Sequence, residues 1–269
     1  MCSLAVKSRR SPTSLTSGPW RILDLLPIVY TDDLKGAMAD RKKLATTLST
    51  QTNGRIKLEF DSLSQGTVSI EDAYDEALNE QYILDKIESA ENNNFSAVVI
   101  DCFGDPALDA ARELVRIPVL GVAQSACHLA AQLAPRFSII NTVPEFVHID
   151  RSLVVKYGLS QHLASVITIN IPVLALEAHA KRTVTTLVSA VKEAANEDGA
   201  QAVVLGCTGM SSLVTALQQR LVEQGLNVPI IEPLRAGVYN AVAWVLAGHS
   251  HSKEAFKQPR AKKRVLAHV

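Results

Sequence analysis

The sequence lacks the features that place a protein in a membrane or on nucleic acid. No hydrophobic run approaches the roughly 18 residues that a bilayer span requires. Lys plus Arg equal Asp plus Glu at 27 each, so no basic surplus exists for an anionic partner. The 269 residues, 47% of them hydrophobic, suffice for one large or two small domains. We predict a soluble protein that binds a small molecule and neither nucleic acid nor membrane.

Cysteine is also scarce. The four cysteines, Cys2, Cys102, Cys127 and Cys207, form no CxxC pair, and the seven histidines show no metal-ligand spacing with them. We therefore expect neither a disulfide framework nor a metal site, and the free thiols favour a reducing, cytoplasmic location. The sequence has neither a P-loop nor a GxGxxG fingerprint, so no cofactor is expected.

Both ends of the chain differ in composition from the rest. Residues 1–19 hold three basic residues and no acid, which is weakly similar to an organellar transit peptide, but Pro12 and Pro19 interrupt any amphipathic helix. Residues 251–269 are basic, with Glu254 as their single acid. We predict that 1–19 and 251–269 are disordered tails.

Short β-branched runs alternate with longer helical patterns, which is typical of parallel sheets with helices on their faces. The expected strands are residues 21–28, 56–63, 97–101, 118–123, 137–142, 166–171, 202–206 and 228–232. The expected helices are residues 70–92, 107–115, 145–157, 174–196, 211–224 and 236–247, with a further one from about Gln124. This number of elements favours two compact α/β halves over one wide sheet.

The two halves resemble each other. AVVIDC at residues 97–102 recurs as AVVLGC at 202–207, and each copy precedes a helical stretch, a second strand and another helix. The repeat is far too long for a solenoid, so it indicates an ancestral duplication. Ligands of open parallel sheets bind beyond the carboxyl ends of the strands. Cys102 and Cys207 are therefore expected to face one cleft from opposite sides.

Each of these two cysteines begins a strand-to-helix turn. In the first turn Asp105 precedes Pro106, so we expect Asp105 to cap the helix that follows. Gly104 and Gly209 allow the backbone to approach a ligand. Free N–H groups and the positive helix end are expected to lower the pKa of each thiol toward neutrality. Cys127 lies inside a helix and is expected to pack in the core.

Two opposed thiols suit the inversion of a carbon acid. One group removes the proton from one face while the other delivers a proton to the opposite face, and the roles exchange for the opposite enantiomer. Backbone amides of the two turns are candidates for stabilising the carbanion at its adjacent carbonyl oxygen. The residues alone therefore indicate a cofactor-independent racemase with Cys102 and Cys207 as its acid/base groups.

At these residues the sequence resembles the aspartate/glutamate/hydantoin racemase superfamily, and within it the hydantoin and allantoin racemase branch. The resemblance runs from about residue 21 to 247. Its most specific motifs are DCFGDP (101–106) with AARE (110–113), LGCTGM (205–210), SIE (69–71) with YDEA (74–77), and GVAQSACH (121–128) with RFS (136–138).

The resemblance implies an α/β fold of two pseudo-symmetric flavodoxin-like domains, each with a parallel sheet flanked by helices. Residues 20–122 plus 233–250 would form the domain that carries Cys102, and residues 123–232 the domain that carries Cys207. It also implies a cofactor-free isomerase, often a homo-oligomer, with these two cysteines as the catalytic pair. The residues expected to contact the substrate are Phe103, Gly104, Asp105, Thr208, Gly209, Pro27, Gln124 and Thr142.

The implied reaction is racemisation or epimerisation of a 5-substituted hydantoin or of allantoin, but one departure leaves the substrate open. The branch usually carries Asn-Pro-Asn-Thr/Ser after the first strand, whereas this chain has LPIVYT (26–31) and retains only Pro27. The alternatives are an aspartate/glutamate-type racemase, a cysteine-dependent isomerase, lyase or decarboxylase of a small carboxylic acid, and a non-catalytic binding module.

Overall fold

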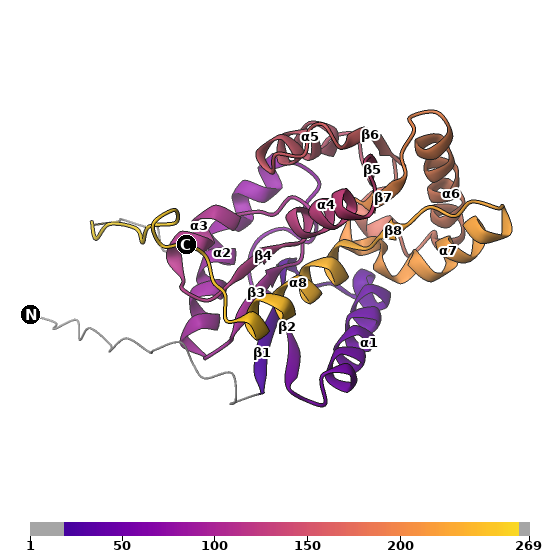
Figure 1. The fold of residues 1–269 in the computed structure, drawn as a ribbon. Helices are drawn as coiled ribbons and strands as arrows, with labels where there is room; N and C mark the ends of the chain where they lie inside the picture. Colours follow the sequence, from indigo (N-terminus) through magenta and orange to yellow (C-terminus); the bar gives the residue numbers. More distant parts are fainter. Residues whose placement is uncertain (1–18, 264–269) are drawn as a thin grey trace, which may run out of the picture.

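Two parallel four-stranded sheets form the framework of the computed structural model, which describes residues 19–263 (Figure 1). The first sheet has the order β2-β1-β3-β4, from β1 (Trp20–Val29), β2 (Ile56–Leu63), β3 (Ala97–Ile100) and β4 (Val119–Gly121). The second has the order β6-β5-β7-β8, from β5 (Phe137–Asn141), β6 (Leu163–Thr168), β7 (Ala202–Leu205) and β8 (Ile230–Ile231). The repeated order confirms the predicted pair of α/β units.

Helices flank both sheets. They are α1 (Lys35–Gln51), α2 (Ala73–Asn92), α3 (Leu108–Leu114), α4 (Val122–Leu133), α5 (Phe146–Lys156), α6 (Ala180–Asn196), α7 (Val214–Glu223) and α8 (Pro233–Ala247), with 3-10 helices η1 (Asp32–Leu34), η2 (Val173–Ala175) and η3 (Thr208–Leu213). The inner strands β3 and β7 are apolar and wholly buried, as expected for parallel strands covered on both faces. Among the described helices, none is long and apolar enough to cross a bilayer.

The chain passes between the two units twice. After β4 it enters α4, where Ala126 shares a core cluster with Phe137 of the second sheet. After β8 it enters α8, which returns to the first sheet, where Val238 shares a cluster with Ile22. This packing supports the division into 20–122 plus 233–250 and 123–232, which we retain as a proposal.

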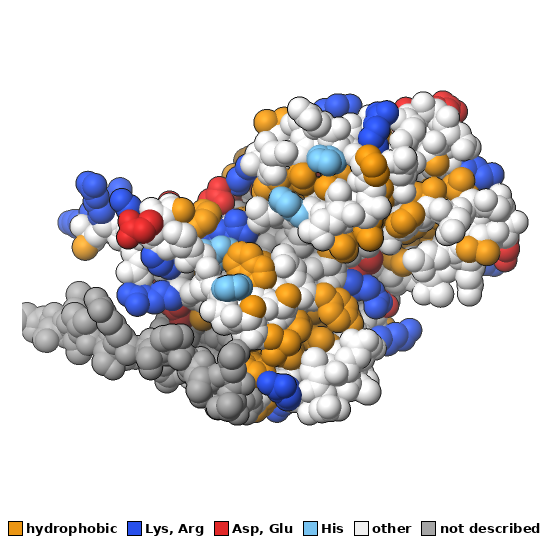
Figure 2. Space-filling model, viewed as in Figure 1, with side chains coloured by type: hydrophobic (Ala, Val, Ile, Leu, Met, Phe, Trp, Pro, Cys, Tyr) orange, Lys and Arg blue, Asp and Glu red, His pale blue; other side chains and the backbone are white. Residues whose placement is uncertain are grey.

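Helices α4 and α8 pack against each other. Figure 2 shows the same face of the molecule, with hydrophobic side chains visible over α8 and over the second unit; Leu133 of α4 and Tyr239 of α8 are among the exposed ones. A groove between α4, α7 and α8 lies on this side of the chain, and its lining shares no residue with that of the cysteine cavity described below.

Helix α1 was not among the expected helices. Its buried residues are Ala37, Arg41, Leu44 and Leu48, and most of the others are polar. Because a charged residue occupies one of these four positions, the apolar periodicity of the segment is weak.

Most element boundaries differ from those predicted by a few residues: β6 is Leu163–Thr168 where 166–171 was expected, and α6 begins at Ala180 instead of residue 174. The strand expected over 118–123 ends at Gly121, because Val122 already begins α4. The helix expected over 70–92 begins after Asp72, whose carboxylate accepts a hydrogen bond from the Asp75 N–H at 2.9 Å. A capping side chain therefore fixes the start of α2.

The predicted C-terminal tail is packed in part. Of residues 251–269, the structure describes those up to 263. The His251 Nε2 lies 2.9 Å from the Val119 carbonyl oxygen, and the Lys253 ammonium donates to the Arg112 carbonyl at the end of α3. The first part of this segment is therefore docked on the first unit rather than disordered. Residues 1–18 and 264–269, the rest of the predicted tails, lie outside the described residues.

Candidate active site

A cavity lies between the two units, beyond the carboxyl ends of β3 and β7. Cys102 follows β3 and Cys207 follows β7, and both are partly exposed free thiols. The residues that line the cavity come from both units: Leu26, Pro27, Ile28, Leu34, Ala37, Arg41, Ser69, Ile70, Asp101, Cys102, Phe103, Phe146, Val173, Gly206, Cys207, Thr208 and Gly209. The fold thus brings the two predicted cysteines to one cavity, one from each copy of the repeat.

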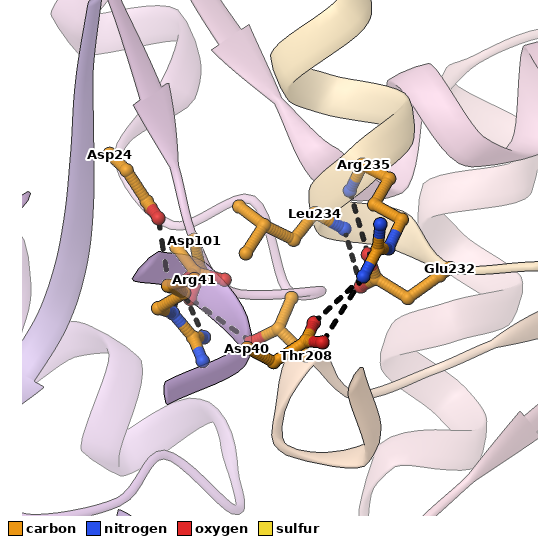
Figure 3. Close-up of polar contacts among 8 residues, drawn as sticks. All are labelled: Asp24, Asp40, Arg41, Asp101, Thr208, Glu232, Leu234 and Arg235. Carbon is orange, nitrogen blue, oxygen red and sulfur yellow. Dashed lines mark hydrogen bonds and ion pairs between the residues drawn. The ribbon is translucent and has the colours of Figure 1, made fainter. Parts of the chain in front are cut away.

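Hydrogen bonds hold the two cysteine turns. The Gly209 N–H donates to the Cys207 Sγ at 3.4 Å, so the thiol itself caps the short helix η3. The Thr208 hydroxyl donates to the carbonyl oxygen of Asp101 at 3.4 Å and ties the second turn to the first (Figure 3). The peptide immediately before Cys102 is therefore bonded to the residue immediately after Cys207.

Burial dominates the ionisation of both thiols. It raises the pKa of Cys207 to about 12, although the Gly209 N–H acts against the rise. It also raises the pKa of Cys102 well above its ordinary value, and the Glu76 carboxylate adds to the effect. The expected lowering of both pKa values is wrong, because desolvation of the charged form outweighs the amide dipoles of the turns. A thiolate formed in this cavity is therefore a strong base.

The eight predicted substrate contacts divide into two groups. Pro27, Phe103, Thr208 and Gly209 line the cavity with the two thiols. Gly104, Asp105, Gln124 and Thr142 are not part of the lining.

Asp105 caps a different helix from the one predicted. Its backbone has a φ of 48°, and its carboxylate accepts hydrogen bonds from the N–H groups of Ala123 (2.9 Å) and Gln124 (2.8 Å) and from the Tyr157 hydroxyl (2.6 Å). Asp105 therefore caps α4, while α3 begins after Ala107 without a side-chain cap. The predicted capping of its own helix is wrong, because the left-handed turn points the carboxylate toward the neighbouring element.

The other three residues outside the lining have structural partners. The Gln124 Oε1 accepts from a guanidinium N–H of α3 at 2.6 Å, and the Thr142 N–H donates to the Asn141 side chain at 2.7 Å. Gly104 lies against Glu76, so closely that a Cβ on this glycine would be 1.7 Å from the Glu76 Oε1. A side chain at this position would have to displace the carboxyl group of Glu76.

One wall of the cavity contains a buried charge cluster that the sequence reasoning missed. Arg41 of α1 donates to the Asp101 Oδ2 through Nε (2.7 Å) and Nη2, and its Nε lies 3.8 Å from the Oδ2 of Asp24 in β1 (Figure 3). All three residues are under 5% exposed. The available signal was Asp24, a single acid among the apolar residues of the buried part of β1.

The remaining wall is mainly apolar. Leu26 and Ile28 stand where the family resemblance led us to look for asparagines, and Ile70, Phe146 and Val173 lie around the same cavity. Ser69 and Ile70 belong to the SIE motif, which is thereby placed at the site. Between residues 19 and 263, no three His, Cys, Asp or Glu side chains are arranged to hold a metal ion.

The fold and the site together define a two-unit α/β enzyme with one cysteine from each unit in a shared cavity. The Asp/Glu/hydantoin racemase family profile matches residues 41–241, and the chain belongs to this family. It is an isomerase, a racemase.

Similar proteins cover most of the chain. The hydantoin racemase of Rhizobium meliloti is 42% identical over 195 residues, which are 72% of this chain and 79% of the relative. That of Paenarthrobacter aurescens is 38% identical over 204 residues, 76% and 84% of the two chains. Among solved structures, the allantoin racemase from Klebsiella pneumoniae matches with a TM-score of 0.81 and 32% identity, over 93% of this chain and 97% of its own.

Proposed function

We propose that this racemase acts on a cyclic ureide, a 5-substituted hydantoin or allantoin, without a cofactor, and that Cys102 and Cys207 are its two acid/base groups. The observation that carries the proposal is the cavity lined by both thiols, each from the end of an equivalent strand. The similar hydantoin and allantoin racemases support the substrate class. The homo-oligomer and the cytoplasmic location stay predictions.

The chemistry requires one thiolate and one thiol. The thiolate takes the proton from C5, and the electron pair of the broken C–H bond moves into the adjacent carbonyl group. The other thiol then delivers its proton to the opposite face and becomes the thiolate. Because an ionised thiol raises the pKa of its neighbour, as Cys207 does for Cys102, the pair favours a single negative charge.

The cavity wall supplies the remaining requirements. Gly206 and Gly209, which have no side chains, line the cavity, so main-chain groups of the second turn are available to the substrate's carbonyl oxygen. Leu26, Ile28 and Phe146 offer apolar surface to the ring or its substituent. An apolar wall thus favours delivery of the proton from the opposing thiol over delivery from bulk water.

Solvent-deuterium exchange tests the proposal. Single-enantiomer 5-substituted hydantoins and allantoin are incubated in deuterated buffer, and the entry of deuterium and the loss of optical rotation are followed against a blank without enzyme. We expect Cys102→Ser and Cys207→Ser each to lower the rate by about 10²- to 10⁴-fold, the usual contribution of one acid/base group.

Cys127→Ser is the matched control, because Cys127 is buried in a core cluster and does not itself line the cavity. It should keep the wild-type exchange rate. Full activity in either active-site variant would rule out the two-thiol mechanism, and exchange of aspartate or glutamate instead of ureides would reassign the substrate.

A further inference from the structure

The charged groups around the two thiols differ, although the two turns are alike in sequence. Cys207 receives the Gly209 N–H at 3.4 Å and is influenced by three charged residues, the acids Asp101 and Glu71 and the cation Arg41. Asp101 is itself paired with Arg41. A buried cation therefore offsets part of the effect of the acids near this thiol.

The surroundings of Cys102 are apolar and acidic. The thiol packs against an apolar cluster that includes Phe146. The charged groups that act on it are Glu76, the Cys207 thiolate and Asp105, and a main-chain N–H of its own turn opposes them. All three groups are negative when ionised, so each of them disfavours a thiolate at Cys102.

The Glu76 carboxyl group lies against Gly104, in the turn that follows Cys102. Its Oε1 is buried without a hydrogen-bond partner among residues 19–263 and occupies the space where Gly104 would carry a Cβ. Burial raises the pKa of Glu76 to about 7. This side chain therefore gains its charge near neutral pH, beside the backbone that holds Cys102.

Arg41 is fixed as a cation beside the second turn. Figure 3 shows the contacts of its guanidinium with Asp24 and with Asp101. Burial opposes the charge, but these two acids hold the pKa of Arg41 above its ordinary value. Burial also raises the pKa of Asp24 well above its usual range, and the shorter of the two ion pairs of Arg41 is the one with Asp101.

We propose that Cys207 loses its proton before Cys102, so that the reactive form of the enzyme carries the thiolate at Cys207 and the proton at Cys102, and that Arg41 and Glu76 are the positioning residues that set this order. The inference rests on the proposed two-thiol mechanism. The reactive form accepts the substrate proton on Cys207 and delivers the proton of Cys102 to the opposite face. Turnover of the other enantiomer, or proton exchange with solvent, restores this form.

Thiol alkylation reads this order directly. Two enantiomers have equal free energies, so kcat/KM is the same in both directions at every pH. Steady-state rates therefore do not reveal which of the two thiols ionises first. Iodoacetamide reacts with thiolates rather than thiols. Alkylation of the peptides that hold Cys102, Cys207 and buried Cys127 is followed by mass spectrometry at low conversion, with wild type and variants compared at the same pH.

We expect Cys207 to be alkylated before Cys102 in the wild type. Arg41→Gln should slow the alkylation of Cys207 about tenfold, which is the effect of raising the pKa of this thiol by one. Arg41→Lys keeps the charge and should restore much of the alkylation rate. Glu76→Gln should speed Cys102 by a similar factor and leave Cys207 unchanged. A merely structural role would move both thiols together in either variant.

Two results would overturn the proposal: earlier alkylation of Cys102 in the wild type, or an equal response of both thiols to Glu76→Gln. If circular dichroism shows that Arg41→Gln does not fold, Glu76→Gln alone tests the proposal. Because no substrate is used, an inactive wild type in the exchange assay would refute the proposed function without affecting these readings.

Discussion

At the scale of the residue, the Asp105 carboxylate joins the start of α4 to Tyr157 at the end of α5. Its place before Pro106 predicted a capping carboxylate, and the carboxylate does cap a helix. The capped helix is α4 instead of α3, because the φ of 48° turns the side chain across the sheet end. The same holds for the thiol of Cys207. The N–H donor at Gly209 was predictable, but the burial of the thiol depends on the whole cavity and was not predictable.

Asp105→Ala should lower the free energy of unfolding by about 2–4 kcal/mol, because two buried N–H groups and the Tyr157 hydroxyl lose their acceptor. Tyr157→Phe removes only one of the three donors and should cost about 1 kcal/mol. Urea unfolding followed by circular dichroism measures both. Equal losses in the two variants would contradict the role of this carboxylate as the cap of α4.

At the scale of the element, the repeated strands were predictable because β3 and β7 are continuous apolar runs. Helix α1 was not, since Arg41 stands on its buried face and serves the cavity instead of the core. The segment after α8 was predicted as a tail from its basic composition. Its docking depends on a few side chains, His251 among them, which composition does not reveal.

The docking of this segment should depend on pH through His251. Burial, with Arg112 nearby, lowers the pKa of His251 from 6.5 to about 4. Its contribution to stability is therefore complete above pH 6.5 and is lost as the pH falls toward 4. We expect His251→Gln to reduce the loss of stability between about pH 7 and 5 by about 1 kcal/mol, a figure discounted for partial exposure. Urea unfolding at both pH values measures this loss. An equal loss in the wild type and in His251→Gln would disprove the docking contribution.

At the scale of the whole molecule, the duplication in the sequence predicted two matching sheets and a shared cavity. The charges enclosed between and within the units were not predictable, because each depends on contacts between distant segments. Burial raises the pKa of Asp105 to about 6 and those of Glu76, Asp150 and Glu232 to about 7. The folded protein thus holds protons that the unfolded chain has released, and these contributions to stability are lost as the pH rises through 6–7.

Asp150→Asn should weaken the dependence of the free energy of unfolding on pH. Asp150 is fully buried, accepts one hydrogen bond from the Asn141 side-chain amide at 2.8 Å, and has an Oδ1 without a partner among the described residues. The amide can still accept that bond but never ionises. The fall in the free energy of unfolding between about pH 5 and 8 should shrink by about 2–4 kcal/mol. Urea unfolding at both pH values measures this change. An unchanged fall would show that the pH dependence comes from groups other than Asp150.

The double passage of the chain between the units has a mechanical consequence. The connections before α4 and before α8 run close together, since these two helices pack along each other. Two units joined at two neighbouring points have less freedom to move relative to each other than two units joined once. A movement that opened the cavity about these two connections would separate the Cys102 and Cys207 sulfur atoms, and its reversal would restore their separation.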